Sequence, residues 1–516
     1  MTENRRIILN ILATYGRSLY AVALGLFSAR WILAALGASD YGLYGLIAGL
    51  TVFIGFFSSL LAGAVGRFYA YTVGAVRSAA DKGCAIEECR KWFNTALCIH
   101  TVVPVILMLV GVPIGIWAIR SWLAIDPAKI GQALEVFACV CVSCFVGMVN
   151  VPFTAMYTAK QYIAELTIYG IVQSTLNFCF LLFMVTHPGD WLVRYAVWAA
   201  LVSILPQVII CIRAIKVFPE CRFNVRYLWN VSRFKQLGTY AGWHMFGAVG
   251  VLLRAQGIQV LVNKYFGTTV NASMSIAGNV NGQTQSLASA MQTAFTPAIV
   301  QACGAKEYNL MRTLAYRACK FSLLLSLIFT IPLSIEIDCV MRLWLKTPPE
   351  YVSGLCLCMM AMLIVDKSAV GHMVALNANG KIALYQSFLG TVVILTLPVA
   401  WLFVWLGLGV YSVIWAMILM QCLCSIGRVW LARKLVNMSA QHWVIQIVFP
   451  IACVSGVTFL VARLATLGFA PTFWRVVCTT FVAEVIFLPL VWGVVLDTAE
   501  RRYVLNGIKK LLSKLV

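Results

Sequence analysis

The sequence predicts an all-α polytopic membrane protein with about fourteen transmembrane helices. Of its 516 residues, 61% are hydrophobic and only 11% are charged, and the mean hydropathy is +0.88. Many stretches are close to the roughly 20 apolar residues that cross a bilayer. Lys and Arg also concentrate in alternate connections between these stretches, as they do in multi-pass proteins.

A hydropathy scan separates the chain into candidate spans. The first follows Arg5 and Arg6 and continues past the short apolar core of a signal peptide without a cleavage site, so we expect it to be a transmembrane helix. The approximate limits of the fourteen spans are 7–36, 41–66, 94–119, 130–156, 165–187, 191–212, 237–263, 271–300, 318–341, 351–376, 383–406, 408–432, 442–466 and 472–496.

The distribution of basic residues predicts the orientation. With the N-terminus inside, 27 of the 39 Lys and Arg residues lie on the inner side, with Arg428 counted among them, and 8 lie on the outer side. This asymmetry predicts that both termini lie in the cytoplasm. The net charge of +21 then sits where anionic lipids of the inner leaflet meet it, so nucleic acid is not needed as a partner.

A weak internal repeat predicts two lobes. An offset of 230 residues maps Gly37 onto Gly267, and it brings two spans with the same seam of small residues into register. Because six spans separate the two copies, the repeat is parallel. The predicted organisation is an N-terminal lobe at 1–215 (helices 1–6), a cytoplasmic inter-lobe loop at 216–236, a C-terminal lobe at 237–436 (helices 7–12), helices 13–14 at 437–496 and a basic amphipathic cytoplasmic tail at 497–516.

One candidate span is unusually polar. Residues 271–296 read NASMSIAGNVNGQTQSLASAMQTAFT, and helical spacing gathers the amides and hydroxyls, Asn279, Gln283 and Gln285 among them, on one side of the helix. Two interpretations stay open: a packing seam of small residues between helices, or the wall of a wet central cavity. The number of amide side chains favours the cavity, because polar groups inside a membrane need partners.

Several segments carry a resemblance to a known family. These are RWILAALGASDYGLYGLIAG at 30–49, RAQGIQVLVNKYFGTTVNASMSIAGNVNG at 254–282, FTPAIVQACGAKEYNLMRTLAYRACKFS at 295–322, RLWLKTPPEY at 342–351 and NANGKIALYQ at 377–386. Over about residues 5–435 the chain resembles the polysaccharide-biosynthesis flippases, which export O-antigen (lipopolysaccharide) and capsule repeat units. These flippases belong to the multidrug/oligosaccharidyl-lipid/polysaccharide exporter superfamily.

The resemblance implies two six-helix lobes around a central cavity. It also implies that a lipid-linked oligosaccharide moves from the inner to the outer leaflet by alternating access. The polysaccharide polymerase and the chain-length machinery are the further partners that it suggests. The chain departs from the family pattern at Met274 and Gly278, where an Arg and a Gln are expected, so a cationic contact is missing or is supplied elsewhere.

No catalytic motif is present, so the sequence does not predict an enzyme, and we expect no cofactor and no metal. Gly380-Lys381 lacks the earlier glycine of a phosphate-binding loop. The five histidines have no metal-ligand spacing. His244 either titrates in the cavity or is a hydrogen-bonded packing residue. The pair Cys141 and Cys144 is more consistent with apolar filler than with a redox site.

Charged residues inside the spans are the remaining signal. The predicted spans contain few Asp and Glu residues to balance four basic ones, Arg17, Arg30, Arg254 and Lys367. A charged side chain in hydrocarbon needs a partner or a cavity. Asp366 and Lys367 either neutralise charges on other helices or take part in transport, with Asp366 and His244 as candidate sites for a coupling ion or proton. Arginine suits a diphosphate, because its planar guanidinium forms paired hydrogen bonds.

These observations favour a flippase for undecaprenyl-diphosphate-linked oligosaccharide. The cation-lined cavity would take the diphosphate, and the amides of 271–296 would take the sugar hydroxyls. The alternative is a related multidrug or cation antiporter, which should present an acidic cavity instead. A membrane glycosyltransferase or polymerase would need a large outer loop or an aspartate-rich domain, and the sequence shows neither.

Overall fold

The computed structural model describes residues 52–78, 82–122, 125–187, 189–345, 348–380 and 382–502, together with scattered positions between 10 and 47. Within these residues the chain is helical and forms no strand. The predicted all-α class is therefore confirmed. Two compact units divide the chain: unit 2 comprises Leu9–Gly242 and Val300–Lys306, and unit 1 comprises Trp243–Ile299 and the chain from Glu307 onward. The predicted lobe boundaries and the parallel repeat stay predictions.

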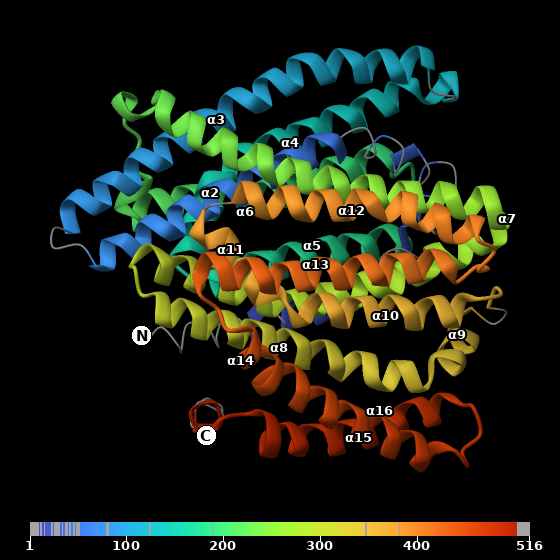
Figure 1. The fold of residues 1–516 in the computed structure, drawn as a ribbon. Coiled ribbons are helices and arrows are strands. Elements are labelled where there is room, and N and C mark those ends of the chain that lie inside the picture. Colours follow the sequence, from blue (N-terminus) through green and yellow to red (C-terminus); the bar gives the residue numbers. More distant parts are fainter. Residues whose placement is uncertain are drawn as a thin grey trace, which may run out of the picture. The chain divides into compact units, whose positions relative to one another are not determined.

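The described residues of unit 2 form two buried apolar clusters, and the larger joins α4 (Ile130–Ala159) to α6 (Leu192–Val217). The larger cluster includes Ile119, Val136 and Leu192, which come from three different parts of the chain and are fully buried. The other continuous helices of this unit are α2 (Val52–Ser78), α3 (Lys82–Trp117) and α5 (Ile163–Thr186), and α4 packs against both α3 and α6 (Figure 1).

Helix α7 (Val231–Gly304) begins in unit 2, passes through unit 1 and ends in unit 2. The sequence predicts two separate spans here, at 237–263 and 271–300. The structure confirms two helices here, because α7 consists of two helical segments that meet at a non-helical break at Gly267, whose φ of 83° is left-handed. Glycine adopts this conformation without the steric cost that a Cβ brings, so the break occurs at this position.

Unit 1 is organised around its two most buried apolar helices. Its elements after α7 are α8 (Tyr308–Ile335), α9 (Ile337–Leu345), α10 (Val352–Ser368), α11 (Val370–Asn379), α12 (Ile382–Trp405), α13 (Ser412–Val436), α14 (Ala440–Trp443), α15 (Phe449–Thr466) and α16 (Phe473–Leu490). In their most apolar stretches α8 is 72% buried and α13 is 67% buried, whereas those of α12, α15 and α16 are 28% buried or less. The more exposed helices are therefore the ones left to face lipid.

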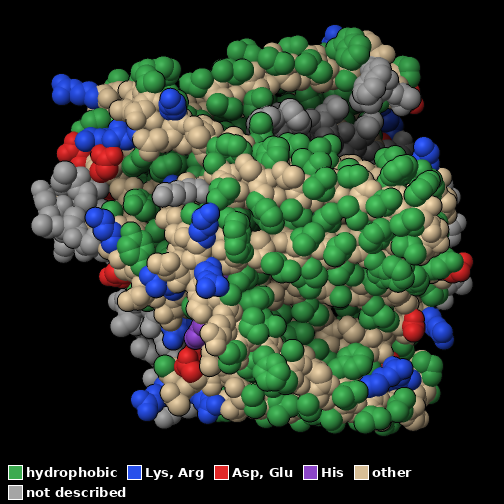
Figure 2. Space-filling view, viewed as in Figure 1, with side chains coloured by type: hydrophobic (Ala, Val, Ile, Leu, Met, Phe, Trp, Pro, Cys, Tyr) green, Lys and Arg blue, Asp and Glu red, His purple; other side chains and the backbone are tan. Residues whose placement is uncertain are grey.

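Helices α12 and α13 run side by side and present an apolar outer surface (Figure 1). Figure 2 shows hydrophobic side chains over the lengths of these two helices, as a lipid-facing surface requires. Exposed side chains on this surface include Leu395, Trp415, Leu419 and Ile426.

The last two helices, α15 and α16, pair with each other and pack on α8. Apolar residues of all three helices, including Leu327, Val454 and Phe487, form one buried cluster. At one end the buried carboxylate of Glu336, which follows α8, accepts hydrogen bonds at 2.9 Å from Arg475 and from Thr479 of α16. Apolar burial and this ion pair attach the C-terminal helices to unit 1.

Ten helices of the described chain are long and apolar enough to cross a membrane, or eleven if α10 and α11 are one bent span. Two differences separate eleven from the fourteen predicted spans, and the limits of one counted span differ from the prediction. Most of the predicted span 7–36 and the first part of 41–66 lie outside the described residues, so neither span is counted. The polar part of α7 is too hydrophilic to count as an apolar span. The predicted limits 318–341 are wrong, because α8 ends at Ile335 and a separate helix, α9, begins at Ile337.

Candidate functional site

The polar segment of α7, residues 271–296, has two faces. Asn279, Gln283, Gln285 and Ser286 are exposed, and Thr293 continues the same surface. Hydroxyls along the helix are satisfied locally: Ser289 donates to the carbonyl of Gln285 at 2.8 Å, for example. The side-chain amides that the sequence singled out are thus accessible rather than packed inside unit 1.

The opposite face of the same segment packs into the core of unit 1. Met274 and Ala277 are buried in a cluster with Ile258 from the first half of α7 and with residues of α9, α10 and α13. Ile276 and Val280 lie against this cluster. The apolar face fixes the helix in the unit, and the polar face is left for water or a ligand.

A broken helix lies close to this segment. Helices α10 and α11 meet at Ala369 with a bend of 44°. The break removes helical hydrogen bonds, and side chains from elsewhere satisfy the freed carbonyl groups. Ser425 donates to the carbonyl of Val365 at 3.1 Å, and Trp443 donates to that of Ser368 at 2.7 Å.

The charged residues of unit 1 meet at this break. Asp366 accepts a hydrogen bond from Arg428 Nη1 of α13 at 2.7 Å and one from Gln421 Nε2 at 2.9 Å. The Lys367 ammonium group lies 3.6 Å from the second carboxylate oxygen of Asp366 and 3.5 Å from the Ser289 hydroxyl of α7. Lys367 is only 2% exposed and Arg428 only 6%. We call Asp366, Lys367 and Arg428 the charge cluster.

The charge cluster carries more positive than negative charge. One carboxylate faces two cations directly, and Arg254 of α7 lies within electrostatic reach of both Asp366 and Arg428. Arg254 is partly exposed, whereas the other two cations are buried. Buried positive charge without a full set of counter-charges attracts an anion, because desolvation is costly for an unpaired ion.

The other predicted site residues lie in different surroundings. His244 Nδ1 is 3.4 Å from the amide nitrogen of Gln386 on α12, so this histidine is a hydrogen-bonded residue in unit 1. Arg17 belongs to unit 2 and packs closely on Gly170 of α5, where a Cβ would lie 2.5 Å from the guanidinium carbon. Arg30 lies outside the described residues.

Sequence reasoning missed Arg428 and Gln421. Its assignment of Arg428 to an inner connection is wrong, because the side chain is buried in α13 against Asp366. A signal was available: Gln421, Ser425 and Arg428 follow one another at spacings of four and three residues, which places them on one face of a helix. All three bind the end of α10.

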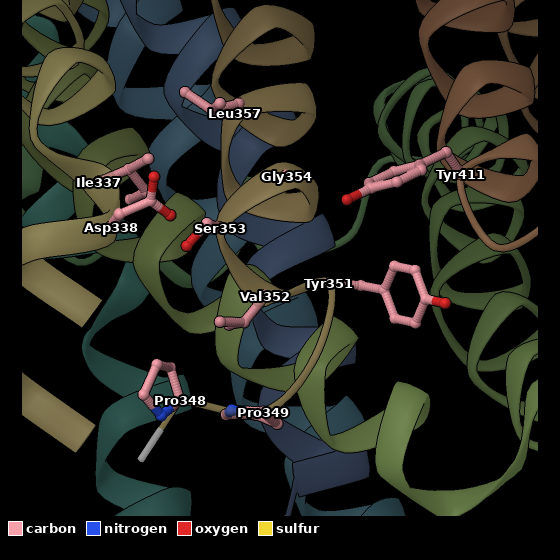
Figure 3. A pocket seen from close by; sticks show the side chains of 10 residues that line it. All are labelled: Ile337, Asp338, Pro348, Pro349, Tyr351, Val352, Ser353, Gly354, Leu357 and Tyr411. Atoms are coloured by element: carbon pink, nitrogen blue, oxygen red, sulfur yellow. The ribbon is translucent and has the colours of Figure 1, made fainter. Parts of the chain in front are cut away.

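A second polar feature of unit 1 is a pocket of about 370 Å³ around the start of α10 (Figure 3). Asp338, Ser353 and the rings of Tyr351 and Tyr411 line it, and the two rings meet edge to face with centroids 5.8 Å apart. Tyr351 has a left-handed φ of 68°. Asp366 lies near the other end of α10, about 21 Å away at 1.5 Å per residue, so the pocket is separate from the charge cluster.

Comparison with known proteins adds the fold family. Residues 252–402 match the sequence model of the MatE family. The outward-facing conformation of a multidrug resistance MATE family transporter of the MOP superfamily is similar to the chain, with 15% identity, a TM-score of 0.70 and coverage of 85% of this chain and 96% of that one. The chain has the MATE transporter fold.

Two further solved structures have this fold. A MATE protein in complex with MaD3S is 14% identical, with a TM-score of 0.67 and coverage of 85% of this chain and 97% of that one. A MOP superfamily transporter from Pyrococcus furiosus, described as having a binding pocket of reversed polarity that suggests a different function, is 14% identical, with a TM-score of 0.67 and coverage of 85% and 96%. No curated protein sequence matches the chain.

The MATE fold and the long apolar helices of the described chain indicate a multi-pass membrane protein. The matched segment, 252–402, contains Arg254, the polar segment of α7, the broken helix and most of the charge cluster. Arg428 lies beyond it.

Proposed function

We propose that this protein is a flippase for polyprenyl-diphosphate-linked oligosaccharide, and that it moves repeat units from the inner to the outer leaflet for surface polysaccharide assembly. The observation that carries the proposal is the excess of positive charge beside an amide-rich surface. Lys367 contacts Ser289 of the polar α7 segment at 3.5 Å, and Arg254 lies on the α7 segment that precedes the break at Gly267. Cations suit the diphosphate, and amides suit sugar hydroxyls.

The state of Asp366 distinguishes this proposal from its main alternative. A cation carrier needs a carboxylate that is free to meet its cargo. Asp366 instead accepts hydrogen bonds from Arg428 and Gln421 and lies beside Lys367. The charge cluster therefore favours an anionic cargo over a cationic drug. The Pyrococcus furiosus transporter, which shares the fold, is itself described as having reversed pocket polarity.

A multidrug or cation antiporter is the second candidate, and one observation favours it. The chain is similar in fold to a multidrug resistance MATE family transporter over 85% of its length. In that case Asp366 and His244 would be the groups that bind a coupling ion or proton. Under the flippase proposal Asp366 and His244 are candidates for the same coupling role.

The partners expected for a flippase are the polysaccharide polymerase, the chain-length machinery and the anionic lipids of a bacterial inner membrane.

A charge series at Arg254 tests the proposal. If Arg254 binds the diphosphate, Arg254→Ala removes a charge-assisted partner that is worth about 1.5–3 kcal/mol, or roughly tenfold to a hundredfold in affinity. Arg254→Glu adds repulsion and should be worse, whereas Arg254→Lys keeps the charge and should recover part of the activity. The measurements are surface glycan and inner-leaflet lipid-linked repeat unit in a host that lacks its own flippase.

Two results would contradict the flippase. Normal surface glycan with Arg254→Glu at matched expression would remove the diphosphate role. Resistance to cationic dyes conferred by the unmodified protein, and lost in Asp366→Asn, would support the antiporter.

A further inference from the structure

The connection between α6 and α7, residues 218–230, is held in a defined conformation although it contains only short 3₁₀ turns. Two such turns, Pro219–Cys221 and Val225–Tyr227, make up its regular structure. Asn224 and Asn230 each accept a hydrogen bond from a backbone amide that follows them, so they cap the second turn and the start of α7. These caps stabilise the connection locally.

The N-terminal part of α3 also binds this connection at several points. Asn94 donates to the carbonyl of Arg222 at 3.1 Å and accepts from the amide of Asn224 at 2.8 Å. Arg90 Nε donates to the same Arg222 carbonyl at 3.1 Å, and Tyr227 donates its hydroxyl to Glu87 at 2.5 Å. The Glu87 carboxylate also raises the pKa of Tyr227, so this donor keeps its proton. The connection is thus fixed on α3.

Because the connection is fixed on α3, some of its side chains are buried and others are exposed. Phe218 and Cys221 are buried, and Glu220 is buried in an ion pair with Lys160 at 2.7 Å. Phe223, Val225 and Trp229 point outward, with exposures of 60%, 68% and 72%. Because hydrogen bonds to α3 fix the connection, these large apolar side chains stay exposed. Such an exposed apolar surface indicates a binding site for a partner.

The same outward surface carries positive charge. Arg222 and Arg226 are exposed, and their side chains make no ion pair or hydrogen bond with any described residue. The acids nearby are already engaged: Glu220 binds Lys160, Glu87 binds Tyr227 and Glu88 binds Arg233. We call Arg222, Phe223, Val225, Arg226 and Trp229 the interfacial patch.

The position of the patch identifies its partner. The flanking helices, which end at Val217 and begin at Val231, are both long and apolar enough to cross a membrane. A connection this short between two spans lies at the membrane surface. Apolar and aromatic side chains there enter the boundary between headgroups and acyl chains, while arginines bind phosphate.

We propose that the interfacial patch binds an anionic phospholipid, with Arg222 and Arg226 on the headgroup and with Phe223, Val225 and Trp229 among the acyl chains. A soluble anion would meet only the arginines and leave the apolar side chains unexplained. A protein partner would have to displace the lipid surface from a connection that lies within it. The site is independent of the transported cargo, so its test does not depend on the flippase proposal.

The experiment is native mass spectrometry of the purified full-length protein, titrated with phosphatidylglycerol or phosphatidylcholine. The variants are Arg222→Gln with Arg226→Gln, and Trp229→Ala. Each arginine near a membrane surface contributes about 1 kcal/mol, so the double variant should bind phosphatidylglycerol roughly tenfold or more weakly than the unmodified protein. Trp229→Ala should bind both lipids more weakly and keep the preference for phosphatidylglycerol.

Matched controls come from exposed residues elsewhere. Trp474 has the same 72% exposure as Trp229, and Arg120 is an exposed arginine at a helix end away from the patch. Trp474→Ala and Arg120→Gln should leave phosphatidylglycerol binding unchanged. Arg222→Lys with Arg226→Lys keeps the charge and should retain most of it, which separates loss of the site from loss of folding.

Three outcomes would overturn the proposal. One is unchanged phosphatidylglycerol binding in the Gln double variant. Another is equal binding of the two lipids by the unmodified protein, which would indicate a surface for a protein partner or for lipid of any charge. The last is competition by inorganic phosphate that fully displaces the lipid, which would assign the arginines to a soluble anion.

Discussion

Arg428 and Asp366 form the polar link between α13 and the broken helix of unit 1. The guanidinium group donates to Asp366 Oδ1 at 2.7 Å, and the same nitrogen lies 3.4 Å from the Asp366 backbone carbonyl. One arginine therefore neutralises the carboxylate and also satisfies a carbonyl that the break in the helix has freed. Without Arg428, the carboxylate would keep only Gln421 and Lys367, and the carbonyl would keep only the Ala369 amide.

Breaking this pair should destabilise the protein. Removing one partner of a buried ion pair costs about 3–5 kcal/mol when the other charge is left uncompensated. Lys367 and Gln421 stay beside Asp366, so we expect a loss at the lower end of this range. Arg428→Ala should therefore lower the temperature at which the detergent-solubilised protein aggregates. The control is Arg342→Ala, because Arg342 is an exposed arginine of α9. A variant that joins Arg428→Met to Asp366→Leu should regain part of the loss. Full stability of Arg428→Ala alone would show that the pair is dispensable.

Close packing of α8 on α11 predicts a second stability effect. A Cβ at Gly371 would lie 1.8 Å from the backbone oxygen of Ala315, and backbone cannot move aside as a flexible side chain can. Gly371→Ala should therefore separate the two helices and reduce the yield of folded, monodisperse protein. Gly456→Ala on α15 is the matched control, since nothing lies within 4 Å of a Cβ there. Equal yields for the two variants would contradict this reading of the packing.

The charge asymmetry of the connections predicts the membrane orientation. Reporter fusions at Lys82 and Arg226 should show the cytoplasmic pattern, and fusions at Lys129 and Lys346 should show the outer pattern. The interfacial patch would then face the anionic inner leaflet. An outer location for Arg226 would overturn the predicted topology of both lobes.

Hydropathy and charge predicted much of the fold because membrane helices follow length and composition closely. Helices α4, α5, α6, α12 and α13 lie close to their predicted limits. The predicted spans 237–263 and 271–300 correspond to the two segments of α7 on either side of Gly267. The error at 318–341 has a local cause. Glu336 interrupts an apolar stretch, and a separate helix, α9, follows it.

The candidate site was only partly predictable. The exposed face of the polar segment follows from helical spacing, and Asn279, Gln283 and Gln285 do lie on it. The partner of Asp366 does not follow, because Arg428 is 62 residues away and hydropathy places it near the end of a span. Such a contact depends on tertiary packing, which a single sequence does not reveal. The roles of Arg17, Arg30 and Arg254 stay predictions.

The polar face of α7 gives the remaining prediction. Asn279, Gln283 and Gln285 are exposed, and the opposite face holds the helix in the core. Replacing all three by leucine should leave membrane insertion and stability intact, since no core contact changes. Export should fall to background, because sugar hydroxyls would meet an apolar surface that cannot replace their bonds to water. The control exchanges amides, as Asn279→Gln, Gln283→Asn and Gln285→Asn, and should keep part of the activity.

Surface glycan is measured in a host without its own flippase, at matched protein levels. Normal export by the leucine variant would mean that the cargo does not use this face, and the interpretation of the segment as a packing seam would stand.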